Sequence, residues 1–320
     1  MSPALKPALL AALIAPALPA GAFQLALPVD CMLGESCFIQ HAPDHDPGPG
    51  AQDFACGSLT YDGHDGTDFA LPSLNAMQAG VAVLAAAPGT VRGLRDGMAD
   101  IRQGDAGAPT VAGRECGNGV VLSHEDDWET QYCHLKQGSI RVKAGDRVAA
   151  GTPLGEIGLS GMTEFPHLHL SLRRNGTEVD PFAPEAQSTC GASQPDLWQP
   201  DLALQPGGLI TGGFASEVPA YDAVQQGDVA RPDATSPGFV FWAYLYGTRA
   251  GDRLDLRLTG PDGILAEENV TLERTQAQSF RALGKRLRAA RWPSGNYIGE
   301  AVLHRGDAVI DRHRAEITLP

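Results

Sequence analysis

Three short segments of this 320-residue chain carry side chains that together could bind a metal ion and move protons. They are residues 64–68 (His-Asp-Gly-Thr-Asp), 132–135 (Tyr-Cys-His-Leu) and 167–169 (His-Leu-His). Imidazoles and carboxylates are zinc ligands, and a zinc hydrolase needs three protein ligands, an open coordination position and groups for proton transfer. Each segment alone is a weak indication, but the three in this order predict such a site.

The pair of histidines near residue 168 has the spacing of a strand. His167 and His169 are two residues apart, so in a strand both imidazoles project to one face while Leu168 and Leu170 project to the other. Both histidines can bind one metal ion, or one can bind it while the other lies beside the bound water. Taken in isolation, the pattern also fits a surface strand with polar residues facing water.

His64 and Asp68 are four residues apart, which would bring them together on a helix. Gly63 and Gly66 argue against a helix, so we expect a turn that leads into a strand at residues 68–71. A polar turn is the alternative interpretation of this pattern by itself. The two other histidine-bearing segments favour the metal site.

Composition divides the chain into segments that must position these groups. Residues 59–183 are rich in glycine and valine and show short strand patterns, which predicts one β domain. Residues 23–58 contain turn formers and three cysteines and predict a loop-rich lead-in. We interpret its His41 and His45 as solvated loop residues, with metal binding or a cover over the site as the alternative. Residues 184–200 resemble a proline-containing linker, and residues 201–320 predict a second all-β unit.

The first residues predict export. Lys6, an apolar run over residues 8–17 and the small residues at 20–22 are typical of a signal peptide spanning residues 1–22, which places the mature protein in the periplasm or outside the cell. A retained membrane anchor is the alternative, but the run is short and Pro16 interrupts it. Six cysteines in an exported chain predict up to three disulfides, and no Cys-x-x-Cys pair supports a cysteine-rich zinc site. A net charge of −14 argues against a nucleic-acid partner.

Residues 60–183 resemble the lysostaphin-type (LytM-like) zinc metallopeptidases, a family of peptidoglycan endopeptidases. Residues 66–70 (Gly-Thr-Asp-Phe-Ala) are similar to the first metal motif of the family, and residues 116–124 are similar to its Gly-Asn-strand-His segment. The glycine-containing stretch at 142–155 and the segment Pro-His-Leu-His-Leu at 166–170 complete the resemblance in order and spacing.

By position, the resemblance implies that His64, Asp68 and His169 bind one zinc ion and that His134 and His167 act as catalytic histidines beside it. It implies an all-β fold with an antiparallel peptidase sheet, and hydrolysis of peptide cross-links in peptidoglycan by a zinc-activated water. The bond that is cut stays open between D-Ala–diaminopimelate, a glycine bridge and another peptide.

Cysteines flank the expected hairpin in a way that departs from the family pattern. Strands at 118–124 and 129–135 should pair antiparallel, which places Cys116 and Cys133 in the same part of the sheet and predicts a disulfide beside His134. Two unrelated buried thiols are the alternative. Residues 162–165 are bulkier than the family version and are expected to narrow the substrate groove.

Two other functions stay open at this point. Some members of the family have lost metal ligands and activate other wall hydrolases, so a catalytically silent wall-binding activator is the alternative to an enzyme. Residues 142–151 also resemble a hairpin of biotinyl-lipoyl carrier domains, although no modified-lysine motif is present. For residues 201–320 we expect an immunoglobulin-like β-sandwich that locates or regulates the enzyme and offers a surface to a protein partner.

Overall fold

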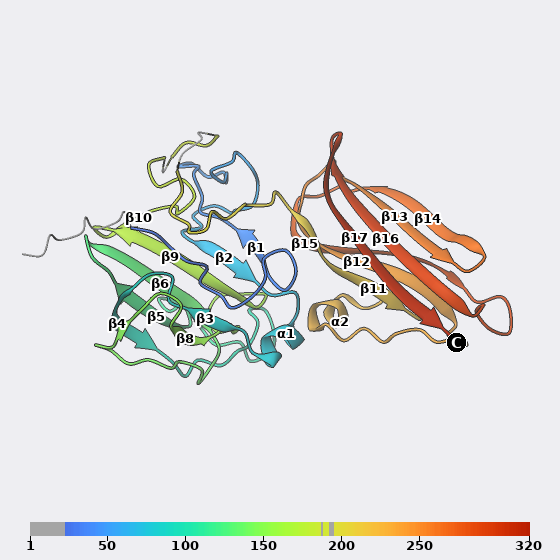
Figure 1. Ribbon diagram of the computed structural model, residues 1–320, viewed down its shortest axis with the longest axis horizontal. Coiled ribbons are helices and arrows are strands. Elements are labelled where there is room, and N and C mark those ends of the chain that lie inside the picture. Colours follow the sequence, from blue (N-terminus) through green and yellow to red (C-terminus); the bar gives the residue numbers. More distant parts are fainter. Residues whose placement is uncertain (1–22, 187, 192–194) are drawn as a thin grey trace, which may run out of the picture.

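The computed structural model of the protein describes residues 23–186, 188–191 and 195–320. Figure 1 shows two β-rich units side by side, with the short helices α1 (Leu74–Ala79) and α2 (Tyr221–Gln226) between them. The predicted signal peptide, residues 1–22, lies outside the described residues. Within the described part of the chain, no helix has both the length and the apolar character needed to cross a membrane.

The first unit is built on an eight-stranded antiparallel sheet. Its strands lie in the order β1-β2-β9-β6-β5-β4-β7, and β10 pairs with β9. A small second sheet pairs β3 with β8. The strands are β1 (Phe38–His41), β2 (Thr67–Ala70), β3 (Ala82–Leu84), β4 (Gly89–Arg95), β5 (Asn118–Ser123), β6 (Trp128–Leu135), β7 (Arg147–Val148), β8 (Pro153–Glu156), β9 (His167–Arg174) and β10 (Thr177–Glu178).

The central strand β9 has a different chemistry on each face. Leu168, Leu170 and Leu172 belong to the main hydrophobic core of the first unit. His167 and His169 lie on the opposite face, as the two-residue period of a strand requires, and both are buried. The predicted strand and its orientation are therefore present, and its polar face lies inside the protein.

The lead-in is more ordered than its composition indicates. Residues 38–41 form β1, which pairs antiparallel with β2 and brings His41 opposite Asp68. His41 and His45 are both buried, so our interpretation of them as solvated loop residues was wrong. The sequence did not predict this strand, because it has only four residues, turn formers follow it, and its partner β2 comes after a long loop.

The expected linker also packs against the first unit. Trp198 is buried in its core, where its ring lies 5.9 Å from that of Phe69. Cys190 forms a disulfide with Cys56, and a second disulfide joins Cys31 and Cys37. The division of the chain at residues 58, 183 and 200 stays a prediction.

The hairpin of β5 and β6 and its disulfide are confirmed. The two strands pair antiparallel, and the Cys116 and Cys133 sulfurs are bonded.

The second unit is a β-sandwich of two antiparallel sheets. One has the order β11-β12-β15 and the other β14-β13-β16-β17. Buried residues of both sheets form one core, which includes Phe241, Leu256 and Tyr297. The immunoglobulin-like topology stays a prediction. The strands are β11 (Gly208–Ala215), β12 (Gly238–Thr248), β13 (Arg253–Gly260), β14 (Gly263–Thr271), β15 (Gln276–Arg286), β16 (Gly295–Arg305) and β17 (Ala308–Leu319).

Candidate active site

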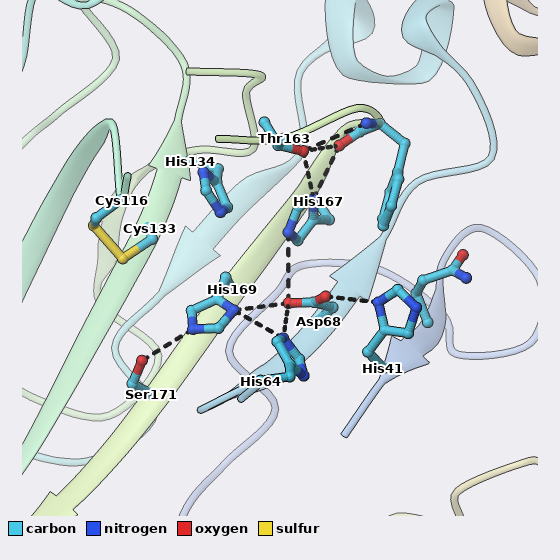
Figure 2. A network of polar contacts seen from close by, with 12 residues as sticks. His41, His64, Asp68, Cys116, Cys133, His134, Thr163, His167, His169 and Ser171 are labelled. Carbon is cyan, nitrogen blue, oxygen red and sulfur yellow. Dashed lines mark hydrogen bonds and ion pairs between the residues drawn. A yellow bond between two sulfur atoms is a disulfide. The ribbon is translucent and has the colours of Figure 1, made fainter. Parts of the chain in front are cut away.

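Three buried side chains converge on one point at the polar face of the sheet. His64, Asp68 and His169 each offer one donor atom, and all three atoms lie within 4.8 Å of one another. The Asp68 Oδ1 atom is 3.2 Å from His64 Nε2 and 2.9 Å from His169 Nδ1. The two imidazole nitrogens are 3.2 Å apart. Figure 2 shows this cluster with His134 and His167 beside it.

The donor set fits a zinc ion. With metal–ligand distances of about 2.0–2.1 Å, ligand atoms at the corners of a tetrahedron lie about 3.3 Å apart. The observed separations of 2.9–3.2 Å are close to this spacing. The His64 and His169 nitrogens face each other and the Asp68 carboxylate. A cation or a proton between these atoms would stabilise the arrangement.

Sheet register explains why residues far apart in sequence meet here. Asp68 on β2 is directly opposite His169 on β9, and His41 on β1 is opposite Asp68 from the other side. Residues directly opposite each other in adjacent strands project from the same face. The three strands therefore place a row of polar side chains on one face, and the turn before β2 adds His64.

Each of the three donor side chains is held by a second contact. His64 Nδ1 donates to the Ala42 carbonyl oxygen at 2.8 Å. His169 Nε2 lies 3.1 Å from a carboxylate oxygen of Asp65. The remaining Asp68 oxygen, Oδ2, lies 3.0 Å from His41 Nδ1. Such outer contacts orient metal ligands and set the tautomer of each histidine.

Electrostatics favour an anionic Asp68 in this buried group. Burial raises the pKa of its carboxyl, but the nearby His64 and His167 imidazoles and the hydrogen bonds from His169 and His41 outweigh burial. The pKa of Asp68 consequently lies well below its usual range. Burial lowers the pKa of His169, yet its hydrogen bonds to Asp65 and Asp68 raise that pKa to about 9 when no metal is bound. The site therefore attracts positive charge.

His134 and His167 are held so that one ring nitrogen is free to accept a proton. His134 Nδ1 donates to the Ser160 carbonyl oxygen at 2.8 Å, and His167 Nδ1 donates to the Phe165 carbonyl oxygen at 2.9 Å. Each Nε2 then carries the lone pair. His167 Nε2 is 3.5 Å from Asp68 Oδ1. The centroids of the His134 and His167 rings are 4.6 Å apart.

Both of these imidazoles are neutral at neutral pH. Burial lowers the pKa of His167 to about 4. Burial, together with His167 and His169, holds the pKa of His134 well below its usual value. Neutral imidazoles with a free Nε2 can act as general bases.

The backbone at His134 departs from ordinary strand geometry. Its φ is 63°, a left-handed conformation that costs a non-glycine residue of order 1 kcal/mol and is found at functional sites. The His134 N–H donates to the Cys116 carbonyl oxygen at 2.8 Å, and the Cys116–Cys133 disulfide lies directly beside it. The hairpin therefore holds His134 in this conformation from two sides.

A groove with a volume of about 500 Å³ opens over the cluster. Asp68, His134 and His167 line it, together with residues 162–165; that this segment narrows the groove stays a prediction. The groove therefore leaves both histidines and Asp68, one member of the metal-binding group, open to a ligand.

The sequence model of peptidase family M23 matches residues 62–181. This part of the chain belongs to peptidase family M23. The M23 domain contains all five predicted site residues, and the structure brings all five together.

Two bacterial relatives are similar to the M23 domain. The peptidoglycan DD-endopeptidase ShyC of Vibrio cholerae is 36% identical over 81 residues, which are 24% of this chain and 18% of ShyC. The DD-carboxypeptidase/endopeptidase Mpg of Neisseria meningitidis is 33% identical over 105 residues, 32% of this chain and 22% of Mpg. The chain thus matches less than a quarter of the length of either relative.

A solved structure is also similar to this chain. The catalytic domain of the prophage-encoded M23 protein EnpA from Enterococcus faecalis is 27% identical, with a TM-score of 0.31. The match covers 45% of this chain and 88% of that domain.

The sequence did not predict the residues that contact the metal-binding side chains from outside the cluster, which are Asp65, His41 and Ser171. Asp65 lies inside the first motif, and its position beside His64 was a usable signal. His41 lies in the lead-in, and only the pairing of β1 with β2 makes it a neighbour of Asp68. Ser171, 3.0 Å from His169 Nε2, continues the polar face of β9 and follows the same two-residue period.

Proposed function

We propose that residues 59–183 form a zinc metalloendopeptidase that hydrolyses peptide cross-links of peptidoglycan. The observation that carries the proposal is the convergence of three donor atoms with two neutral, buried histidines in an M23 domain. Curated relatives named as peptidoglycan DD-endopeptidases support the substrate class. Because peptidoglycan lies outside the cytoplasm, the proposal includes export to the periplasm or the cell exterior.

In this proposal, His64, Asp68 and His169 hold one zinc ion per chain. Bound zinc supplies Lewis-acid activation of water and of the peptide carbonyl. His134 and His167 are close enough to the metal-binding group to accept a proton at Nε2 and return it to the leaving amine. Their Nδ1 hydrogen bonds to backbone carbonyls keep both rings oriented throughout the cycle.

A catalytically silent activator of another wall hydrolase is the second candidate. The relatives include a cell division protein, DipM of Caulobacter vibrioides, 38% identical over 68 residues. The complete set of five site residues favours the enzyme, since a silent regulator does not need two neutral histidines beside a metal-binding group.

Digestion of purified sacculi separates the two candidates. We expect the mature protein with zinc to release soluble muropeptides, which mass analysis assigns to cleavage of one peptide bond, and a chelator to abolish the release. The proposal fails if zinc-loaded protein binds sacculi but releases no muropeptide. Zinc-loaded His134→Ala serves as the inactive control.

A further inference from the structure

One wall of the groove comes from the β-sandwich and not from the M23 domain. Besides the site histidines, the lining includes Gly247 near the end of β12 and residues 275–277 at the start of β15. These positions lie outside the matched residues 62–181. They are more than sixty residues from the M23 domain along the chain, and the fold brings them over its active site.

We infer that residues 275–277 of the β-sandwich form a substrate subsite, which contacts an uncharged, extended segment of the bound peptide. The inference rests on the proposed function and adds where part of the substrate binds.

A buried amide holds this wall in place. The Gln40 side chain on β1 is fully buried, and its Nε2 donates to the Ala277 carbonyl oxygen at 2.8 Å. Its Oε1 accepts from Gln278 Nε2 at 3.1 Å. Both ends of the amide are therefore bonded to β15. Breaking these bonds would leave buried polar atoms without partners, which is costly.

Apolar contacts close the same interface. The ring of Tyr246 on β12 lies 4.5 Å from that of Phe38 on β1, in a small cluster that also contains Ala70 and Phe165. At Gly247, where φ is +58°, a Cβ atom would lie 2.4 Å from Leu59 Cδ2. The left-handed backbone and this close approach together favour glycine at position 247. The wall is consequently a packed part of the protein, built around β1.

Strand β1 connects the wall to the metal-binding group. Gln40 binds β15, and its neighbour His41 contacts Asp68 at 3.0 Å. Adjacent residues of one strand thus fix the distance between the sandwich and the reacting centre. A peptide positioned by the wall is positioned relative to His134 and His167 as well.

The chemistry of the wall indicates what binds there. Thr275, Gln276 and Ala277 are exposed and uncharged, and Tyr61 and Met162, both more than half exposed, also line the groove. β15 is an edge strand of its sheet. Edge strands and small polar side chains suit an extended peptide backbone, while the Tyr61 ring and the Met162 thioether in the same groove suit small aliphatic side chains.

Gln276 is the position that tests the subsite. It pairs with Thr248, two residues from Tyr246 on β12, and therefore projects from the face of the sheet that meets the first unit. Gln276→Trp places an indole in the groove without altering the Gln40 contacts. Ile264→Trp places the same group on β14, at an exposed position outside the groove lining, and is the matched control.

The experiment uses the full chain and a soluble cross-linked muropeptide dimer. We expect Gln276→Trp to raise KM at least about tenfold with kcat changed less than about twofold, and zinc content unchanged. Ile264→Trp should match the parent protein. Calorimetric titration of the same dimer in the presence of a chelator should show the same loss of affinity for Gln276→Trp.

The two measurements distinguish the inference from the proposed function. If the parent cuts the dimer and Gln276→Trp has the parent's KM and affinity, the subsite is wrong and the proposed function stands. If the parent binds the dimer without cutting it and Gln276→Trp binds it more weakly, the subsite stands and the proposed function fails. A parent that neither binds nor cuts the dimer overturns both.

Discussion

His134 and His167 each use Nδ1 to bind a backbone carbonyl, and this determines what Nε2 can do. With Nδ1–H committed to donation, each Nε2 is an acceptor in a buried site that disfavours the charged ring. The donor atoms of His64, Asp68 and His169 instead face one another. The five residues thus divide by their hydrogen bonds into the two sets of the proposed function, one for metal binding and one for proton transfer.

This division predicts two classes of variant. His64→Ala, Asp68→Ala and His169→Ala should lose zinc and activity together, because each removes one of three ligands. His134→Ala and His167→Ala should keep close to one zinc per chain while turnover falls by about 10²–10⁴, the usual cost of losing a general base. Metal analysis and muropeptide release measure both quantities, with His313→Ala in the sandwich as control. Full zinc occupancy in His169→Ala, or full turnover in His134→Ala, would contradict the assignment.

At the scale of elements, the β5–β6 hairpin places the Cys116–Cys133 disulfide next to His134, the candidate catalytic residue with a left-handed backbone. Replacing Cys116 and Cys133 with serine should lower the free energy of unfolding by about 2–4 kcal/mol, the typical contribution of a disulfide. It should also lower kcat, since the left-handed backbone at His134 loses its support. Urea unfolding and turnover of the double variant measure the two effects.

The Cys31–Cys37 disulfide provides the matched control, because it closes a loop of only six residues far along the chain from His134. Its double serine variant should lose less stability and keep the parent's kcat. Equal kcat in both double variants would show that the hairpin disulfide does not support the site.

A buried ion pair ties the lead-in to the end of the M23 domain. His45 Nε2 is 2.8 Å from Asp180 and His45 Nδ1 is 2.9 Å from the Thr189 carbonyl oxygen, so a charged His45 ring can donate to both oxygen atoms. Burial lowers the pKa of His45, but these hydrogen bonds outweigh it and raise the pKa above its usual 6.5. Burial raises the pKa of Asp180 as well, so the pair keeps a proton to higher pH than an isolated histidine.

The raised pKa predicts how stability changes with pH. A folded-state pKa above the unfolded value gives stability that is fully present below pH 6.5 and is lost as pH rises through the folded value. His45→Gln should therefore be less stable than the parent at pH 6 by about 1 kcal/mol or more, the usual contribution of a hydrogen bond, and this difference should shrink toward pH 9. Urea unfolding of the zinc-loaded parent and variant at both pH values measures this difference. A difference that grows with pH would contradict a stabilising, protonated His45.

At the scale of the whole molecule, the sequence predicts local features better than distant contacts. The motifs around residues 64, 134 and 168 predicted which side chains lie together, because each is a short pattern that can be recognised without its neighbours in space. Nothing local indicates that Gln40 binds Ala277, since that contact depends on how two units pack. The strand β1 was missed for the same reason, because four residues become a strand only through pairing with β2.

The packing of the two units refines the expectation that residues 201–320 perform no chemistry. A chain that ends at Pro195 keeps all five site residues and the Cys56–Cys190 disulfide, so it should bind one zinc ion. Its Tm should fall, because the first unit loses Trp198 from its core and Phe38 and Phe165 lose their contacts around Tyr246. On a small soluble cross-linked peptide, kcat should stay within about tenfold of the parent while KM rises, because the groove loses one wall.

Zinc analysis, thermal unfolding and steady-state kinetics on the shortened and full-length chains test this division. If the shortened chain folds and binds zinc but cuts nothing, the sandwich supplies part of the chemistry and not only a subsite. If its KM equals that of the full chain, the wall contributes nothing to peptide binding. A higher KM with retained turnover is the one result that agrees with an M23 domain that performs the chemistry and a sandwich that helps to hold the substrate.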